Sequence, residues 1–448
     1  MKARLASARS AQRRWARVPL RQRLALVRRW RIQIAENASL LAELTAQPHQ
    51  RPVTEKLVSE VIPLLDACRF LEREGRWILR ARRMGRRGRP LWLSGSSFTV
   101  ERKPFGVILI VGPRNYPLFL PGVQMLQALV AGNAILLKPA EGCTAPLRWL
   151  VDQLIDLGLE EEHLIQLLPE APAAAQEAVR EGLDKVIFTG SSENGRHLLG
   201  LMAEQNTPGV FELSGADVVI VRQDADLDRA AGAVAFGRTL NDGQTCMAPA
   251  LVLAQREVIA GLRKRLGELS VAGLDIQSFG DDQDVVNLMR TREYGLGAAI
   301  FSADAMMADQ LAHQLPTGFV TINDVIVPTA DPRFPFGGVR ASGFGTTRGA
   351  EGLLEMTYPH VVAVRRSRWL PHLQQAQPGD EDIFLAYARL VHGRGARRIQ
   401  SLGDLWRAMR QRGRVVGLPR LDGVETPKVE VQRPESAQAS KTVSIASS

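Results

Sequence analysis

The sequence predicts an α/β fold built on open parallel sheets. A run of apolar, β-branched residues at 105–111 is bounded by Gly112-Pro113, which is typical of a buried parallel strand. Between residues 123 and 188, strand-like segments alternate with helical segments of about ten residues, a pattern typical of βαβ units. A second alternating set continues to about residue 357. At about 100–200 residues per domain, a chain of 448 residues is predicted to form two or three domains.

Periodicity predicts the individual elements. Apolar stripes at helical spacing cover residues 10–46 and recur over 54–80. The first alternating set comprises helix 123–131, strand 133–137, helix 145–157, strand 164–168, helix 173–181 and strand 185–188, and the second opens with strand 217–221 and helix 227–240. After residue 364 the composition changes. Segments 382–391 and 402–411 have helical character, whereas 419–448 is rich in Pro, Ser and Lys and is predicted to be disordered.

Composition excludes several classes of protein. Hydrophobic residues make up 45% of the chain and charged residues 23%, the balance of a soluble globular protein rather than a fibrous or disordered one. The three cysteines, Cys68, Cys143 and Cys246, form no C-x-x-C pair, so we predict neither a disulfide framework nor a metal site. This cysteine usage favours a reducing, cytoplasmic location.

The formal charge of +10 is concentrated at one end of the chain. Residues 1–89 hold 22 Lys/Arg against 7 Asp/Glu. The arginine-rich stretch 80–89 has no interleaved aromatic residues and no zinc-finger or helix-turn-helix signature, so we expect a solvated basic face and no specific nucleic-acid partner.

The chain also lacks the pattern of a secreted or membrane-spanning protein. Arginines interrupt any apolar core of a signal peptide near the N-terminus, although an organellar presequence stays open. The longest uncharged run, 115–137, contains Pro117, Pro121 and Gly132 and is predicted to form buried elements rather than a transmembrane segment.

Two turns carry groups suited to binding or catalysis. The segment Phe188-Thr-Gly-Ser-Ser-Glu-Asn-Gly195 lies where a strand gives way to a helix, so its backbone N–H groups could hold a phosphate. By itself, this turn is better explained as a plain strand-to-helix junction. It is not a Walker A loop, because Arg196-His197 stand where Lys and Ser/Thr are required.

Cys246 lies in a polar glycine loop, Asn241-Asp-Gly-Gln-Thr-Cys246, where a thiolate can act as a nucleophile. The alternative is a small buried hydrophobic residue. Cys68 and Cys143 are predicted to be inert. Glu212 precedes a glycine turn and is the candidate base, with an exposed loop carboxylate as its alternative.

Six short motifs in this order resemble the aldehyde dehydrogenase superfamily, from about residue 11 to residue 364. They are Pro113-Arg-Asn-Tyr-Pro117, Gly132-Asn-Ala-Ile-Leu-Leu-Lys-Pro-Ala-Glu141, Phe188-Thr-Gly-Ser191, Glu212-Leu-Ser-Gly215, Asn241-x-Gly-Gln-Thr-Cys246 and Pro335-Phe-Gly-Gly-Val-Arg-Ala-Ser-Gly-Phe-Gly345. The first and fifth are most similar to the class 3 branch, which oxidises medium-chain and aromatic aldehydes. The resemblance implies a Rossmann-like cofactor domain, a catalytic domain and a late oligomerisation strand.

The resemblance also implies residue roles. Cys246 would attack the aldehyde, Asn115 would help to hold the oxyanion, and Glu212 would activate the water that hydrolyses the thioester. The residues implied to bind cofactor are Lys138, Glu141, Gly190, Ser191 and Phe336. A carboxylate at Glu141 disfavours a 2′-phosphate, so NAD is expected and NADP is possible.

Four differences from the family pattern bear on activity. Arg114 replaces a tryptophan, Ser214 replaces a glycine beside Glu212, and Ala216 replaces a lysine. A side chain at Ser214 can crowd the nicotinamide. The Glu-x-Phe-Gly-Pro motif, which ordinarily binds the nicotinamide ribose, is absent, and the sequence predicts a deletion of several dozen residues after the helical segment 259–269.

We therefore predict NAD-dependent oxidation of an aldehyde to a carboxylic acid through a cysteine thioester. A degenerate relative that binds nucleotide or a partner without turnover is the first alternative, and an acylating or reductive enzyme is the second. The predicted divisions are a cofactor domain at 1–213, a shortened catalytic domain at 214–357, an oligomerisation strand at 358–366 and an extension at 367–448. A homodimer is expected from the resemblance.

Overall fold

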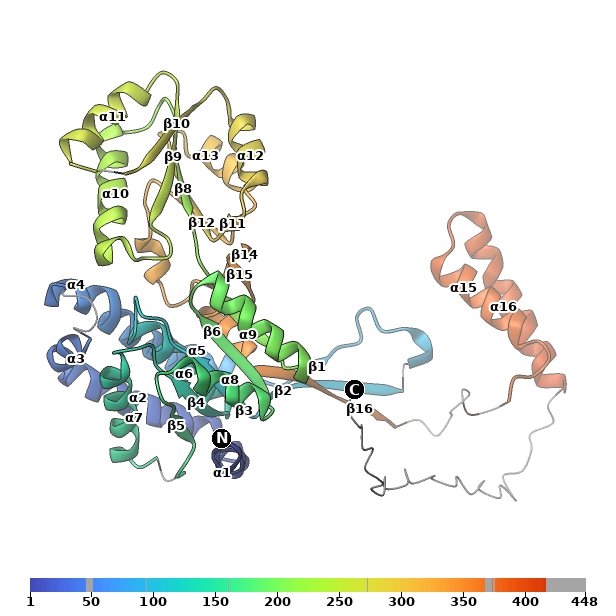
Figure 1. Ribbon diagram of the computed structural model, residues 1–448. Coiled ribbons are helices and arrows are strands. Elements are labelled where there is room, and N and C mark those ends of the chain that lie inside the picture. Colours follow the sequence, from blue (N-terminus) through green and yellow to red (C-terminus); the bar gives the residue numbers. More distant parts are fainter. Residues whose placement is uncertain are drawn as a thin grey trace, which may run out of the picture. The chain divides into compact units, whose positions relative to one another are not determined.

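The computed structural model describes residues 1–45, 51–93, 95–159, 161–271, 273–366, 373 and 375–415. The chain divides into two units, Met1–Arg365 and Arg366–Ser448, and each is described by itself (Figure 1). The segment predicted to be disordered, 419–448, lies outside the described residues.

The first sheet of the larger unit has six strands in the order β15-β7-β6-β3-β4-β5. Their bounds are β3 (Val107–Val111), β4 (Ala134–Lys138), β5 (Ile165–Leu167), β6 (Lys185–Thr189), β7 (Gly209–Glu212) and β15 (Gly343–Phe344). Five strands are parallel, which confirms the predicted fold class. The edge strand β15 is antiparallel to β7. It belongs to a segment that returns to this sheet after the chain has formed the second one.

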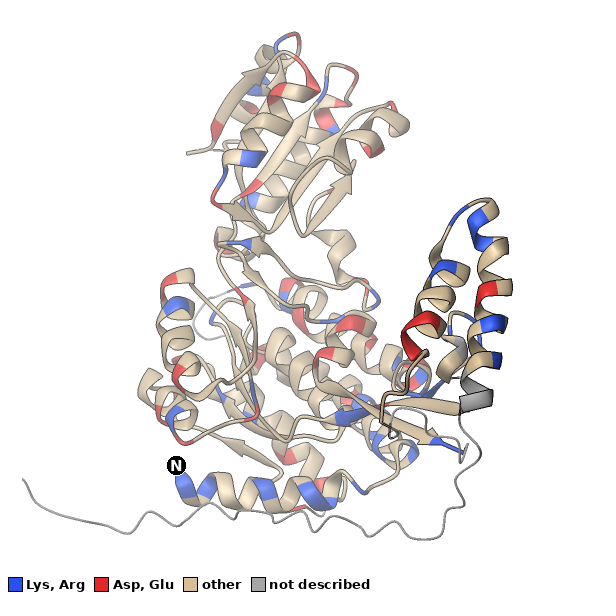
Figure 2. Cartoon of the chain, turned by 90° about the vertical axis from the view of Figure 1, so that its right-hand side faces the viewer, with Lys and Arg blue, Asp and Glu red and all other residues tan. Residues whose placement is uncertain are grey.

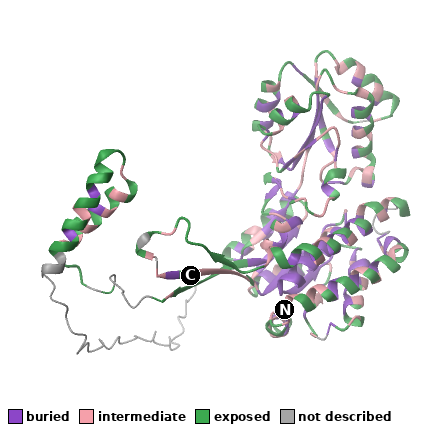
Figure 3. Cartoon of the chain, turned by 180° about the vertical axis from the view of Figure 1, so that it is seen from behind, coloured by how far each residue is buried: buried purple, intermediate pink, exposed green. Residues whose placement is uncertain are grey.

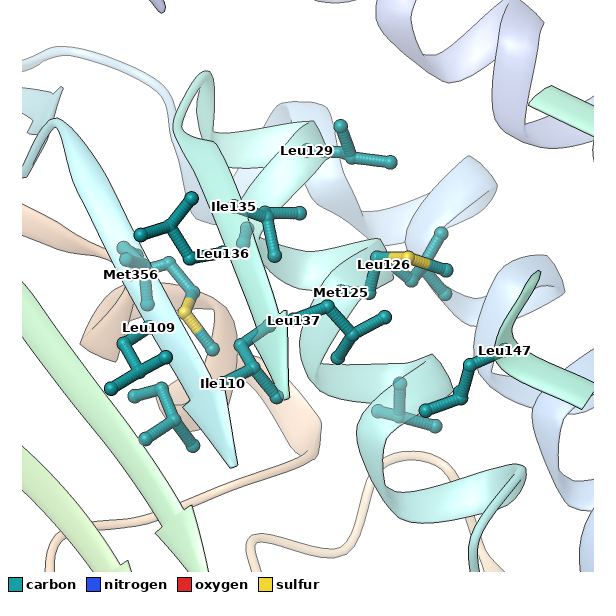
Figure 4. Packing of buried hydrophobic residues seen from close by; sticks show 14 of the residues in the cluster. Leu109, Ile110, Met125, Leu126, Leu129, Ile135, Leu136, Leu137, Leu147 and Met356 are labelled. Carbon is teal, nitrogen blue, oxygen red and sulfur yellow. The ribbon is translucent and has the colours of Figure 1, made fainter. Parts of the chain in front are cut away.

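Helices connect these strands as the periodicity predicts. They are α6 (Phe119–Ala131), α7 (Thr144–Asp156), α8 (Pro172–Arg180) and α9 (Ser192–Gln205). In the core, Leu109 of β3 and Leu136 of β4 lie beside Met356 on one face of the sheet, and Met125 of α6 lies on the other face (Figure 4). All five residues of β3 and of β4 are buried, which is why these strands read as continuous apolar runs.

The N-terminal helices pack against the first sheet's core. They are α1 (Lys2–Trp15), α2 (Leu20–Glu36), α3 (Ala38–Leu44), α4 (Val53–Lys56), a π-helical turn (Leu57–Val61) and α5 (Ile62–Ile78). Two tryptophans anchor them, because the Trp15 indole donates to the Leu129 carbonyl at 2.9 Å and the Trp30 indole donates to the Leu150 carbonyl at 3.0 Å. The helical stretch 10–46 is interrupted at Pro19, which lacks an N–H and disfavours helix in the residue before it.

The second sheet is wholly parallel, with the order β10-β9-β8-β12-β13. Its elements are β8 (Asp217–Val221), α10 (Leu227–Thr239), β9 (Pro249–Gln255), α11 (Ile259–Glu268), β10 (Asp275–Phe279), α12 (Asp282–Thr291), β12 (Gly297–Phe301), α13 (Ala305–Ala312) and β13 (Phe319–Ile322). Alternate residues of β8 pack into two separate cores, Val218 on the side of α12 and α13 and Val219 on the side of α10 and α11.

The remaining elements form smaller pieces. A three-stranded antiparallel sheet joins β1 (Arg82–Met84), β2 (Ser96–Pro104) and β16 (Thr357–Arg365), and β11 (Tyr294–Gly295) pairs with β14 (Val339–Arg340). Short 3-10 turns occur at Leu91–Leu93, Leu240–Gly243 and Val327–Ala330, and α14 (Gly349–Glu355) precedes β16. The second unit contains α15 (Asp380–His392) and α16 (Ala396–Val415), longer than the helical segments predicted there.

Candidate active site

The carboxyl ends of four parallel strands meet at one edge of the first sheet. Val111 of β3 pairs with Lys138 of β4 and with Phe188 of β6, and Thr189 of β6 pairs with Glu212 of β7. Ligands of open α/β sheets bind outside this edge. The register therefore brings together strand ends that the sequence marks only as separate motifs.

Glu212, the last residue of β7, is buried, with 4% of its surface exposed, so it is not an exposed loop carboxylate. The Thr189 hydroxyl donates to Oε2 at 3.2 Å, and the Thr347 hydroxyl donates to Oε1. Burial raises the pKa of Glu212, while the Arg348 cation and the two hydroxyls act in the opposite direction. A carboxylate with a raised pKa can accept a proton near neutral pH.

Cys246 follows a tight turn in which Asn241, Asp242 and Gly243 all have left-handed backbone angles, with φ of 53°, 52° and 72°. The turn places the cysteine against the segment that follows Glu212. A Cβ at Gly215 would lie 2.3 Å from the carbonyl oxygen of Cys246, so only glycine allows this close approach.

The surroundings of the Cys246 thiol are apolar. Cys246 and Met247 pack against a buried cluster of Leu296, Phe319 and Phe336. Burial raises the pKa of the Cys246 thiol to about 12; nearby Glu212 and Asp217 raise it further, and Arg348 lowers it. Cys143 is buried, and burial raises its pKa to about 11.

Asn115 is tied directly to the loop that carries Cys246. Its side-chain amide donates to the carbonyl of Gln244 at 2.9 Å, and the Asn241 amide donates to the backbone carbonyl of Asn115 at 2.8 Å. The neighbouring hydroxyls of Tyr116 and Thr245 share a hydrogen bond of 2.7 Å. An amide NH₂ carries two donors, so Asn115 can support the loop and still offer an N–H to an oxyanion.

A buried ion pair braces this corner from the N-terminal helices. Glu60 lies in the π-helical turn, and its Oε2 accepts from the N–H groups of Leu118 at 2.8 Å and Phe119 at 3.3 Å. Its other oxygen pairs with Arg51, whose guanidinium lies 5.5 Å from the centre of the Tyr116 ring. The sequence alone did not predict this ion pair between Glu60 and Arg51. The one available signal is an acidic residue within an apolar helical stretch, and π-helical turns are frequent at functional sites.

Arg348 is a second functional candidate that the sequence did not reveal. It is 6% exposed, donates to the Thr329 carbonyl at 2.6 Å and lies with its guanidinium 4.2 Å from the centre of the Phe336 ring. Burial lowers the pKa of Arg348, and the negative charges of Glu212 and Cys246 raise it. The position follows the Pro335–Gly345 motif, and that proximity is the only sequence signal.

Asp217 is a further buried acid close to Cys246. Its Oδ1 accepts from the Gly297 N–H at 3.0 Å. Burial raises the pKa of Asp217 to about 7, and the Gly297 hydrogen bond and the Arg292 cation lower it. The thiol therefore lies among two carboxyls and one guanidinium, all withdrawn from water.

The proposed cofactor residues fall into two places. Lys138 ends β4, and Glu141 lies exposed in the next turn, while Ser191 caps α9 by accepting from the Asn194 N–H at 3.3 Å. Burial lowers the pKa of Lys138. Gly190 donates to the Glu212 carbonyl at 3.0 Å. These strand ends and the start of α9 suit a nucleotide.

Phe336 lies apart from those residues. It packs in the cluster that contains Cys246 and Met247, under the Arg348 guanidinium. Its position is that of a side chain lining the thiol. The resemblance groups it with the cofactor residues, and in the structure it packs beside Cys246.

Two departures from the family pattern have visible structural consequences. The Ser214 hydroxyl accepts from the Ser192 N–H at 3.3 Å, so it occupies a donor at the start of α9. Where the family motif is absent, α11 leads through a short connection to β10, and β10 pairs directly with β9. The second sheet is therefore continuous without the missing motif.

Within the described residues, no group of three or more His, Cys, Asp or Glu side chains is arranged to hold a metal. In the same part of the chain, no helix combines the length and apolar character needed to cross a membrane.

Comparisons with known proteins place this geometry in a family. A solved NAD-dependent aldehyde dehydrogenase from Sinorhizobium meliloti superposes with a TM-score of 0.77 at 22% identity, covering 83% of this chain and 88% of that one. The fold is therefore that of the aldehyde dehydrogenases. The sequence model described as "Aldehyde dehydrogenase family" matches residues 1–272 and 274–362. The chain belongs to this family, which confirms the resemblance and the predicted enzyme class, an NAD(P)-dependent aldehyde dehydrogenase.

Curated relatives are similar over most of their length. A 4,4'-diapolycopene aldehyde oxidase from Methylomonas is 28% identical over 480 residues, covering 89% of each chain. A mouse aldehyde dehydrogenase described as dimeric and NADP-preferring is 27% identical over 337 residues, covering 60% of this chain and 74% of its own.

Proposed function

We propose that this chain oxidises an aldehyde to a carboxylic acid with Cys246 as nucleophile, Asn115 as oxyanion donor and Glu212 as base. One observation carries the proposal: the buried Glu212 carboxylate, held by two threonine hydroxyls, lies within electrostatic reach of the Cys246 thiol.

The first step is attack of the Cys246 sulfur on the aldehyde carbon, which forms a carbon–sulfur bond and an oxyanion. The Asn115 amide and the backbone N–H of Cys246 stabilise the negative charge. Because burial disfavours the thiolate, its proton must leave before attack; Glu212 is the buried base close enough to favour this, and Arg348 stabilises the resulting charge.

The second step is loss of hydride from the same carbon, which leaves a thioester on Cys246. Bound NAD would supply the hydride acceptor. Glu212 first releases to solvent the proton that it took from the thiol. It then removes a proton from water as the water attacks the thioester, and it returns this proton to the sulfur as the carboxylic acid leaves. The threonine hydroxyls fix the orientation of the carboxylate for both tasks.

Lys138, Glu141 and the start of α9 are the residues we propose for the nucleotide. The exposed Glu141 carboxylate would hydrogen-bond a ribose hydroxyl and repel a 2′-phosphate, which favours NAD. NADP stays the alternative, because a relative is described as NADP-preferring.

We propose an apolar aldehyde as the substrate class. The thiol is lined by Met247, Phe319, Phe334 and Phe336, side chains that favour a hydrocarbon or aromatic group. A relative named for a diapolycopene aldehyde and the similarity to the class 3 branch support the same choice. The exposed Arg114 leaves room for a charged group at the outer end of the substrate.

We also propose that the chain forms a homodimer through β16. β16 is the edge strand of its sheet, and Tyr358, Val361 and Val364 are exposed along it. A long apolar edge strand is suited to pair with a second copy. Free thiols at all three cysteines support a reducing compartment such as the cytoplasm.

A nucleotide-binding relative without turnover is the second candidate, and the absent Glu-x-Phe-Gly-Pro motif favours it. An acylating enzyme is a third, although the retained Glu212 argues against it. Without the motif, a poorly fixed nicotinamide could cost about 100-fold in rate.

The test measures reduced nicotinamide with purified protein, NAD or NADP, and aliphatic and aromatic aldehydes. We expect turnover that Cys246→Ala abolishes and that Glu212→Gln lowers by about 100-fold or more. Mass spectrometry of Glu212→Gln should show the acyl group on Cys246, and Glu162→Gln, at an exposed position outside the proposed site, is the matched control that retains turnover. No turnover in the parent, with NAD still raising its melting temperature, would favour the degenerate alternative.

A further inference from the structure

The helical hairpin of the second unit lies outside the part of the chain that matches the family. Its helices, α15 and α16, pack along a seam where Ala386, Ser401 and Ala408 are buried. The Arg398 side chain donates to the Leu390 carbonyl at 2.9 Å and closes the turn between them. The remaining surface of the hairpin is largely exposed (Figure 3).

Large apolar side chains line both helices away from this seam. We call them the apolar stripe: Phe384, Val391, Ile399, Leu402, Trp406 and Met409. Phe384 is 68% exposed, Ile399 is 77% exposed and Trp406 is 56% exposed. Along each helix, successive residues of the apolar stripe are three, four or seven positions apart, so they lie on one face. Around the helix axis, this face is about a third of a turn from the residues buried in the seam. Because the helices are antiparallel, these offsets place both halves on the same side of the hairpin.

The hairpin is rich in arginine. Between residues 389 and 415 the sequence has eight arginines and one acidic residue, Asp404. The Arg410 guanidinium lies 3.8 Å from the centre of the exposed Trp406 ring, so a cation adjoins the stripe directly. Figure 2 shows Lys and Arg positions along both helices, while acidic residues gather at the start of α15.

We propose that this hairpin docks on an anionic lipid surface, with the apolar stripe at the acyl boundary and the arginines at the headgroups. An amphipathic helix with arginines and a tryptophan on its borders binds in this way. Charge complementarity favours this occupant. A second copy of the hairpin would bring like charges together, and nucleic acid would leave the apolar stripe exposed to water.

Docking would hold the enzyme where apolar aldehydes dissolve, and this consequence alone rests on the proposed function. Binding itself depends only on the hairpin. Dehydrogenase assays with a water-soluble aldehyde in vesicle-free buffer therefore separate failure of the catalytic proposal from failure of this one.

The test is co-sedimentation of the full chain with vesicles of phosphatidylcholine alone, or with about a third of the lipid replaced by phosphatidylserine. We expect binding to the anionic vesicles, little binding to the neutral ones, and release as NaCl rises from about 0.1 to about 0.5 M. Charge reversal by Arg394→Glu with Arg410→Glu, at two exposed arginines of the hairpin, should weaken binding by about tenfold or more. The variant Ile399→Ser with Trp406→Ser should weaken it at low salt as well.

Matched controls decide the source of any binding. Arg86→Glu with Arg87→Glu reverses two exposed arginines of the first unit and should leave vesicle binding unchanged. Three outcomes overturn the proposal: no binding to anionic vesicles, binding lost only in the Arg86 and Arg87 variant, or binding that the Ile399 and Trp406 variant retains while duplex DNA competes for it. If that variant instead changes the oligomeric state and leaves vesicle binding intact, the stripe contacts protein.

Discussion

Two regions differ in how far their charged groups are exposed to water. One is the corner around Cys246, and the other is the edge of the first sheet near Lys138, Glu141 and the start of α9, which we propose binds the nucleotide and call the nucleotide edge. At the corner, Glu212, Arg348 and Asp217 are all less than 9% exposed, so each charge acts on its neighbours through little water. At the nucleotide edge, Glu141 is exposed and the donors at the start of α9 are partly satisfied by serine hydroxyls. Under the proposed function, catalysis would depend on burial at the first place, and nucleotide binding would depend on backbone geometry at the second.

The strongest test of the buried corner is removal of its cation. Arg348 lowers the pKa of both Glu212 and Cys246, so Arg348→Met should raise both pKa values and move the acid limb of the activity profile to higher pH. At neutral pH we expect kcat/KM to fall by about 10- to 100-fold and to recover partly in alkaline buffer. The measurement is kcat/KM against pH.

Arg348→Lys is the matched control, because it keeps the charge and loses the planar contact with Phe336. It should retain the parental pH profile with a smaller loss of rate. A uniform loss at every pH in Arg348→Met, with no shift of the acid limb, would show that Arg348 acts only through its bond to Thr329.

The sequence predicted the elements around this corner better than the corner itself. Apolar periodicity is local, so strand 217–221 and helix 227–240 agree with β8 and α10 to within one residue. Helix α6 begins four residues before the predicted start, at Phe119, because Pro121 lies in its first turn, where proline is tolerated. The two-residue strand β15 has no detectable periodicity.

The residues of the candidate site also differ in whether the sequence predicts them. Cys246, Glu212 and Asn115 could be predicted because they lie in motifs, and the structure brings them to one corner. Arg348 and Glu60 could not, because an isolated arginine or glutamate ordinarily indicates a solvated surface. Their burial depends on contacts with distant elements, α6 and the Val327–Ala330 turn among them, which no local pattern encodes.

The second test concerns the other buried acid. The folded state raises the pKa of Asp217 from 3.8 to about 7, so the fold favours the protonated form. The unfolded chain therefore holds fewer protons between those values, and the stability of the parent falls as pH rises from about 4 to about 7. Asp217→Asn removes this dependence and keeps an acceptor for the Gly297 N–H.

We expect Asp217→Asn to match the parent in melting temperature near pH 4 and to exceed it at pH 8. The difference in free energy of unfolding at pH 8 is at most about 4 kcal/mol, because one pKa unit corresponds to about 1.4 kcal/mol. Thermal denaturation at both pH values measures it. Asp309→Asn, at an exposed position, is the control and should change neither value. Equal stability of the parent and Asp217→Asn at pH 8 would contradict this prediction, because it would mean that an ionised Asp217 does not lower the free energy of unfolding.

The smallest expected effect lies at the nucleotide edge and separates two consequences of Ser214. Its hydroxyl occupies the Ser192 N–H, a donor that a bound phosphate would otherwise meet, and its Cβ adds volume where the family has glycine. Ser214→Ala frees the donor but keeps the Cβ, whereas Ser214→Gly removes both. If competition for the N–H dominates, both variants should bind NAD a few times more tightly in calorimetry, by similar factors. If crowding dominates, only Ser214→Gly gains. Unchanged affinity for NAD in both variants would show that the nucleotide does not approach the start of α9. The charged groups on which this enzyme depends would then be those of the buried corner.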